Sequence, residues 1–145
     1  EIRSIVESLA GKTDQQLDLT GVLAEVDAFL AAAERLEAMK RRASGSLARR
    51  LNTLLMRLSR ILNPTIYSQS GRFSPDPAEW SPIMRATAQH TLPGLGKAAG
   101  LSQLVGQFEY GFLRAQVVRE TNRVVATLRE ATRLIEETLR APAGG

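Results

Sequence analysis

The chain has no cysteine, one histidine, one tryptophan and an aromatic content of only 5% over 145 residues. Without cysteine there is no disulfide framework and no thiolate chemistry, although this does not fix a cellular compartment. The single histidine, His90, excludes a zinc site built on a pair of histidines within this chain. With so few aromatic residues, the core must consist mainly of leucine, valine and alanine.

Long hydrophobic runs are also missing. No apolar run approaches the roughly 18 residues of a membrane-spanning helix, so we expect no membrane segment in this chain. Glu1 is not a methionine and begins no signal peptide, which favours an excised fragment or a processed chain. The length favours a single domain over residues 1–145, with residues 141–145 as a frayed tail.

Acidic residues are absent from one long stretch. Between Lys40 and Pro75 there is no Asp or Glu, and the net charge of the chain is +4. The stretch could bind a polyanion such as nucleic acid, pair with an acidic helix of a second protomer, or form an ordinary solvated face. No helix-turn-helix spacing is evident and no aromatic residues alternate with the arginines, so nucleic acid is the less favoured partner. The residues that would carry the polyanion alternative are Arg49, Arg50, Arg57 and Arg60.

Apolar residues at helical spacing predict an all-α fold, a bundle of three to four main helices. Residues 1–16 form a short helix and a polar link, residues 17–62 a helical pair, and residues 101–140 one long helix. Such a long helix is more than its neighbours within the chain can cover, so a second copy is expected to cover part of it. The residues predicted to form this dimer interface are Phe108, Phe112, Val118, Val125 and Leu128.

Two details of the helical pair concern its boundaries. Asp18 is placed as the N-cap of its first helix. Ser44-Gly45-Ser46 interrupts the pair, and the sequence leaves open whether 17–42 and 46–62 are two helices or one kinked helix. Asn63-Pro64 is expected to end the second helix, because the residue before a proline is disfavoured in helical conformation.

A long segment, residues 63–100, separates the helical pair from the long helix. It carries five of the six prolines, the only tryptophan and the only histidine. Connections longer than about 12–15 residues are usually functional or disordered, and the aromatic and aliphatic content here favours an ordered loop. Tyr67, Phe73 and Trp80 are expected to pack back onto the bundle.

Catalytic motifs are not evident. There is no phosphate-binding glycine loop, no GxSxG elbow and no metal-ligand spacing. A Ser-His-Asp triad would have to use His90, which fits a turn or interface residue better than a catalytic base. We therefore interpret the isolated chain as non-catalytic, with an enzyme that uses His90 as the remaining alternative.

Three stretches carry a resemblance to a known family. Residues 19–36 resemble its first bundle helix, and RLNTLLMRLSR at 50–60 resembles its RxxNxxLxxLER-like second helix, with Ser59 where an acid is common. Residues 67–73, followed by TLPGL at 91–95, resemble the loop that ends in a Pro-Gly turn before the last helices. Together they resemble the transferrin-receptor-like dimerisation domain, the helical C-terminal module of glutamate-carboxypeptidase-type zinc peptidases.

The resemblance implies a non-catalytic homodimerisation module whose partners are a second copy and a peptidase domain N-terminal to it. It implies no cofactor in this chain, since the family's two zinc ions lie in the peptidase domain. Glutamate-specific members carry a Lys-Tyr pair before the Pro-Gly turn; about Ala86 and Thr87 stand there in this chain, and Arg85 is the neighbouring candidate carboxylate partner. The loop residues expected to face the peptidase domain are Tyr67, Phe73, Arg85 and His90.

Overall fold

The computed structural model describes residues 2–13, 17–67 and 91–140. Within these ranges the chain is all-α and holds no β-strand, which confirms the predicted fold class. None of the described helices is long and apolar enough to cross a membrane. The four longer helices are α1 (Ile2–Lys12), α2 (Thr20–Lys40), α3 (Gly45–Ile66) and α7 (Glu109–Arg140), and between α3 and α7 lie the short α6 (Pro93–Gly96), η1 (Lys97–Gly100) and η2 (Ser102–Leu104).

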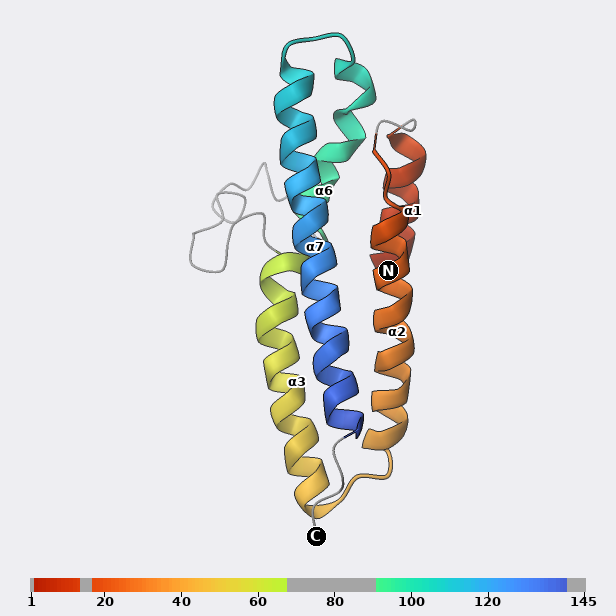
Figure 1. The fold of residues 1–145 in the computed structure, drawn as a ribbon, viewed down its shortest axis with the longest axis vertical. Helices are drawn as coiled ribbons and strands as arrows, with labels where there is room; N and C mark the ends of the chain where they lie inside the picture. Colours follow the sequence, from red (N-terminus) through yellow and green to blue (C-terminus); the bar gives the residue numbers. More distant parts are fainter. Residues whose placement is uncertain (1, 14–16, 68–90, 141–145) are drawn as a thin grey trace.

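Helix α7 is the central element of an elongated bundle (Figure 1). It packs extensively against both α2 and α3, which contact α7 far more than they contact each other. Helix α1 packs against the first half of α2 and against η1. The segment α6–η1–η2 lies alongside the first half of α7. The chain then reverses direction and enters α7 at the end of the bundle that is opposite the α2–α3 connection (Figure 1).

Two apolar cores follow one another along α7. The first core joins α1, the first half of α2, the α6–η1 segment and the first half of α7, and the second core joins the remainder of α2 and α7 with α3. The first core contains Val6, Leu9, Leu19, Val22, Val26, Leu92, Leu95, Ala98, Leu101, Val117, Val124 and Leu128. The second contains Ala32, Leu36, Leu51, Leu54, Leu58, Ala131, Leu134 and Ile135.

The helical pair is two separate helices. Helix α2 ends at Lys40 and α3 begins at Gly45, with Ser44 as its N-cap in extended conformation. The predicted end of the second helix at Asn63-Pro64 is wrong, because α3 continues through Pro64 to Ile66. The last turn is held by a hydrogen bond from the N–H of Tyr67 to the carbonyl of Asn63 (3.0 Å). Buried Thr65, whose hydroxyl lies 2.9 Å from that of Thr127 on α7, anchors the same turn.

The last long helix begins later than predicted, at Glu109 instead of Leu101. Residues 93–104 form short helical turns, and Leu101 is fully buried in the first core. Gly106 has a φ of +83°, a left-handed conformation that glycine adopts without strain and that breaks the helical path before α7.

Both ends of the predicted loop of 63–100 are helical in the structure. Its first residues belong to α3, and residues 93–100 form α6 and η1. Phe73, Trp80, Arg85 and His90 lie outside the described residues.

Candidate functional site

The face of α7 that packs inside the chain differs from the predicted seam. Val117, Val124, Ala131, Leu134 and Ile135 are buried there, together with Leu128. Leu128 is only 3% exposed and belongs to the first core, so the structure places it inside the chain and not on a free surface. Val118 and Val125 are half-buried.

The two remaining seam residues are highly exposed. Phe108 is 82% exposed and Phe112 is 63% exposed. In a straight helix each residue advances by about 100°, so the 16 residues from Phe112 to Leu128 rotate the side-chain direction by about 160°. The five predicted residues therefore do not share one face.

Phe108, Phe112 and Val105 are exposed apolar residues at the start of α7 and in the turn before it, and they are here together called the hairpin tip. It lies where the chain turns from η2 into α7, at one end of the bundle (Figure 1). The two phenylalanine rings meet edge to face, with centroids 5.3 Å apart, and Val105 is 55% exposed. Hydrogen bonds from the N–H of Gln107 to the carbonyl of Leu104 (2.9 Å) and from the N–H of Tyr110 to the carbonyl of Gln107 (3.2 Å) support the turn.

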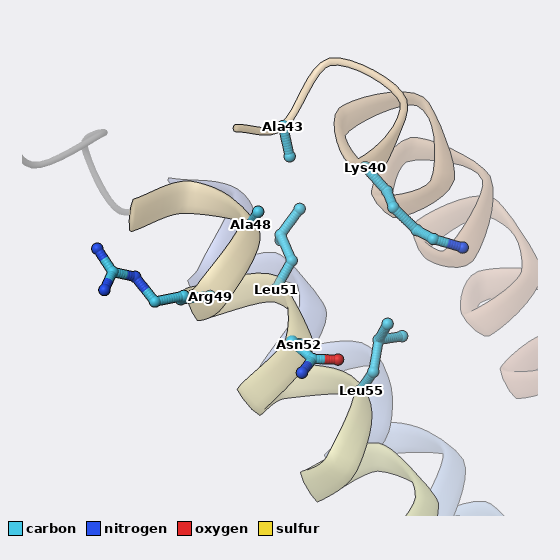
Figure 2. Close-up of a pocket in the computed structure, with 7 residues that line it drawn as sticks. All are labelled: Lys40, Ala43, Ala48, Arg49, Leu51, Asn52 and Leu55. Carbon is cyan, nitrogen blue, oxygen red and sulfur yellow. The ribbon is translucent and has the colours of Figure 1, made fainter. Parts of the chain in front are cut away.

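A second apolar surface lies between α2 and α3 and is here called the α2–α3 groove. Three adjoining hollows of about 390, 410 and 260 Å³ make up this groove. Leu55 lines the first two, and Phe29, Ile66 and Tyr67 line the second and third. Ile135 of α7 also lines the middle hollow. Figure 2 shows the end of the groove near the α2–α3 connection, with Leu51 and Leu55 directed towards the space between the two helices.

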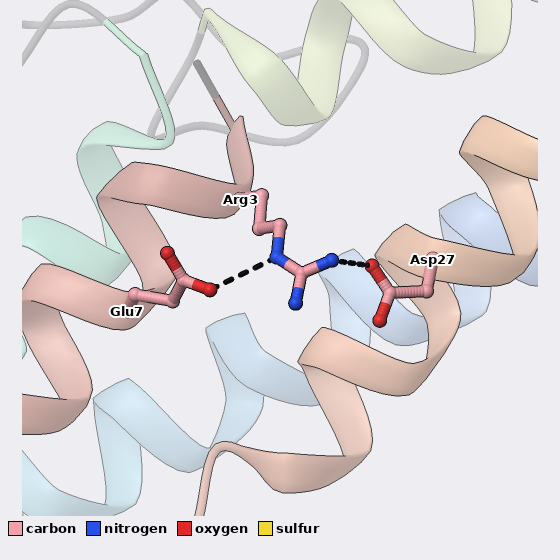
Figure 3. A network of polar contacts seen from close by, with 3 residues as sticks. All are labelled: Arg3, Glu7 and Asp27. Carbon is pink, nitrogen blue, oxygen red and sulfur yellow. Dashed lines mark hydrogen bonds and ion pairs between the residues drawn. The ribbon is translucent and has the colours of Figure 1, made fainter.

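The opposite end of the groove is polar at its edge. There Arg3 of α1 pairs with Glu7 (Nε to Oε1, 2.9 Å) and with Asp27 of α2 (Nη1 to Oδ1, 2.6 Å), as Figure 3 shows. The hydrogen bond to Glu7, followed by the charges of Asp27 and Glu7, raises the pKa of Arg3. The positive charge of Arg3 is therefore offset within the chain.

The four arginines of α3 do not act as one group. Arg49, Arg57 and Arg60 are exposed and recur on one side of the helix, whereas Arg50 is half-buried and donates from Nη2 to the carbonyl of Thr138 on α7 (3.3 Å). Three arginines thus remain available to an anionic partner, and α3 itself has no acidic residue.

Tyr67 is the only predicted loop-facing residue among the described ones. It is 60% exposed at the end of α3 and lines the α2–α3 groove. Sequence reasoning missed this groove. The sequence feature that could have predicted it is the width of the apolar face of α3. Leu55, Leu62 and Ile66 widen this face beyond the residues that pack against α7.

In the part of the chain that the structure describes there is no candidate metal-binding site, because no three His, Asp or Glu side chains lie close enough together to hold an ion.

No protein-family model matches the chain, and no curated protein or solved structure matches it.

Proposed function

We propose that this chain is a non-catalytic interaction module that forms a homodimer through the hairpin tip. The observation that carries the proposal is the exposure of Phe108 and Phe112 as an aromatic pair, with Val105 also exposed three residues before Phe108. Large aromatic side chains dominate the binding energy of many interfaces, because they bury much apolar area at a small loss of side-chain entropy.

The geometry favours a two-fold pairing. A two-fold axis near the tip would bring Phe108 and Phe112 of one protomer against the same residues of its partner. Stable dimers bury about 1,600 Å² in total, more than the tip alone supplies. The contact would therefore extend along the exposed side of the first half of α7, where Ala115 and Arg119 follow Phe112.

Analytical ultracentrifugation over a range of concentrations tests this proposal. The wild-type chain is expected to form a dimer, whereas Phe108→Ser combined with Phe112→Ser should remain monomeric. Met56→Ser is a matched control, because Met56 is an exposed apolar residue of α3 outside the tip; this variant should dimerise like the wild type. A wild-type chain that stays monomeric at about 1 mM, in the range of the weakest specific complexes, would refute the proposal.

The resemblance to the transferrin-receptor-like dimerisation domain extends the proposal to a larger protein. In that setting the module would support a zinc peptidase domain N-terminal to it, and its loop would face the peptidase cleft. The stretches 19–36, 50–60 and 91–95 support this extension. The coding sequence upstream of Glu1 tests it, since a domain with two-zinc ligand spacing is expected there.

Binding of a polyanion is the second candidate function. Its support is the exposed side of α3 that carries Arg49, Arg57 and Arg60 without any acidic residue on the helix. Contacts between several arginines and phosphates would make the affinity for a DNA duplex fall steeply with salt. An anisotropy titration that detects no duplex binding at low salt removes this candidate.

A further inference from the structure

The connection between α2 and α3 joins a run of basic residues to an exposed serine. Its sequence is Lys-Arg-Arg-Ala-Ser at positions 40–44, and no other serine or threonine of the chain has arginines both two and three residues before it. Arg41, Arg42 and Ser44 are all exposed. The connection lies at the end of the bundle opposite the hairpin tip (Figure 1), so neither proposed function uses this serine.

We propose that Ser44 is a phosphorylation site for a serine/threonine kinase that recognises arginines on the N-terminal side of its target. The Oγ atom of Ser44 attacks the γ-phosphorus of ATP, so that a new O–P bond forms while the bond from this phosphorus to the bridging oxygen of ADP breaks. The catalytic aspartate of the kinase takes the hydroxyl proton, and ADP leaves.

The backbone at Ser44 suits an acceptor. Because the attacking oxygen must line up with the bond that breaks, the chain around the target has to enter the kinase cleft outside any helix. Ser44 has φ −140° and ψ 164°, an extended conformation, and its side chain makes no capping hydrogen bond to α3. At the next residue, Gly45, a side chain would meet no atom within 4 Å, so the space beside the acceptor is open.

The two arginines are available to a kinase. Neither guanidinium forms an ion pair with the residues that the structure describes, so both can pair with carboxylates of the kinase through charge-assisted hydrogen bonds. The backbone that carries them is the end of α2, where the N–H of Arg42 donates to the carbonyl of Met39 and the N–H of Ala43 to that of Lys40 (both 3.1 Å). Such a terminal turn opens at a small cost in free energy, which lets the segment extend along the cleft.

Two other exposed serines of α3 are poorer acceptors. Ser59 has an arginine two residues before it but lies well inside α3, which would have to unwind to enter a kinase cleft. Ser46 is only two residues from Ser44 but has Ala43 and Ser44 at the positions where Ser44 has its arginines. Ser46 therefore serves as a matched control for Ser44.

A phosphate on Ser44 would also act on the fold. Ser44 is the N-cap of α3, and the first turn of this helix has no acidic residue. A phosphate brings nearly two negative charges to the positive end of the helix dipole and can accept hydrogen bonds from the first N–H groups. Phosphorylation should therefore raise the melting temperature by about 2 °C.

The test incubates the full chain with magnesium-ATP and cyclic-AMP-dependent protein kinase, an arginine-directed kinase. Intact-mass spectrometry should show the addition of a single phosphoryl group, and fragmentation should locate it on Ser44. Ser44→Ala should lose the modification, whereas Ser46→Ala should keep it at a rate within about twofold of the wild type. Because the Ser44 side chain makes no capping hydrogen bond, Ser44→Ala should stay folded, which circular dichroism verifies.

Replacement of the arginines tests recognition. Arg41→Ala and Arg42→Ala should each lower kcat/KM of the kinase for the chain by about tenfold or more, since each removes a charge-assisted contact. Arg60→Ala is the control, because Arg60 is an exposed arginine of α3 far from Ser44 in sequence. This variant has the same net charge as the other two and should change kcat/KM by less than about twofold.

Four results would overturn the proposal. The first three are equal modification of Ser44→Ala, equal rates for Arg41→Ala and Arg60→Ala, and a melting temperature that falls on phosphorylation. For the fourth, a synthetic peptide of residues 38–50 is the positive control for the kinase. Modification of this peptide but not of the folded chain would show that the α2–α3 connection is closed to the enzyme.

Discussion

At the scale of single residues, Asp18 illustrates how a polar side chain fixes the start of a helix. Its Oδ1 accepts a hydrogen bond from the backbone N–H of Thr20 (2.9 Å) and another from the Thr20 hydroxyl. The hydroxyl makes the larger contribution, and together the two hydrogen bonds lower the pKa of Asp18. The sequence placed Asp18 at the N-cap of this helix, which is wrong by one residue, because Leu19 occupies that position.

The lowered pKa of Asp18 makes the stability of the fold depend on pH. Its folded-state pKa lies below the ordinary value of 3.8, so the carboxylate contributes its full stabilisation above that value and loses it as the pH falls through the folded-state pKa. Asp18→Ala should therefore lower the melting temperature at pH 7, and the difference from the wild type should shrink below about pH 3.8. Thermal unfolding followed by circular dichroism measures this. Asp18→Asn is the control that keeps an acceptor but removes the charge, and a difference that grows on acidification would contradict the assignment.

Adjacent valines explain why the seam predicted on α7 does not follow a single face of the helix. Val117 and Val118, and again Val124 and Val125, are neighbours, so apolar spacing supports two different faces of the helix. The structure buries Val117 and Val124 and leaves Val118 and Val125 half-buried. Which face becomes the core depends on where α2 and α3 pack, and a periodic pattern in α7 alone does not contain that information.

At the scale of helices, the sequence predicted their existence better than their ends. The stripes of α2, α3 and α7 follow from apolar spacing, whereas Pro64 within α3 and Gly106 before α7 shift the ends away from the predicted positions. The last turn of α3 is held by a contact with α7, between the hydroxyls of Thr65 and Thr127. Leu101 is buried in the first core within a run of short helical turns, so the long helix does not begin there.

Replacement of Pro64 tests how much the last turn of α3 depends on these contacts. Proline has no N–H and its ring crowds the carbonyl four residues earlier, so Pro64→Ala should restore a helical hydrogen bond to Arg60. We expect the free energy of unfolding in urea to rise by about 1 kcal/mol, less than the value for a helix centre because Pro64 lies near the end of α3. Pro93→Ala is the control, since proline is favoured in the first turn of α6 and its loss should bring no gain. A loss of stability in Pro64→Ala would show that the proline ring contributes more by packing than it costs the helix.

At the scale of the whole molecule, two apolar surfaces lie in different parts of the bundle. The hairpin tip is at the end where η2 turns into α7 (Figure 1), and the α2–α3 groove runs along α3 from the hollow lined by Ala43 and Ala48 to the hollow lined by Ile66 and Tyr67. The all-α fold and the exposure of Phe108 and Phe112 were within reach of the sequence. The groove was not, because it arises from the separation of α2 and α3 on the two sides of α7.

This separation predicts that a substitution in the α2–α3 groove leaves dimerisation through the hairpin tip unchanged. Substitutions that lie well apart and share no partners change free energies additively, within about 0.5 kcal/mol. Ser59→Glu places a carboxylate in the middle hollow of the groove and should therefore leave the dimerisation constant within about twofold of the wild type, whereas Phe108→Ser with Phe112→Ser should abolish dimerisation. Analytical ultracentrifugation measures both effects, and thermal unfolding verifies that each variant is folded. A Ser59→Glu variant that loses the dimer, while its melting temperature stays unchanged, would instead place the interface at the groove.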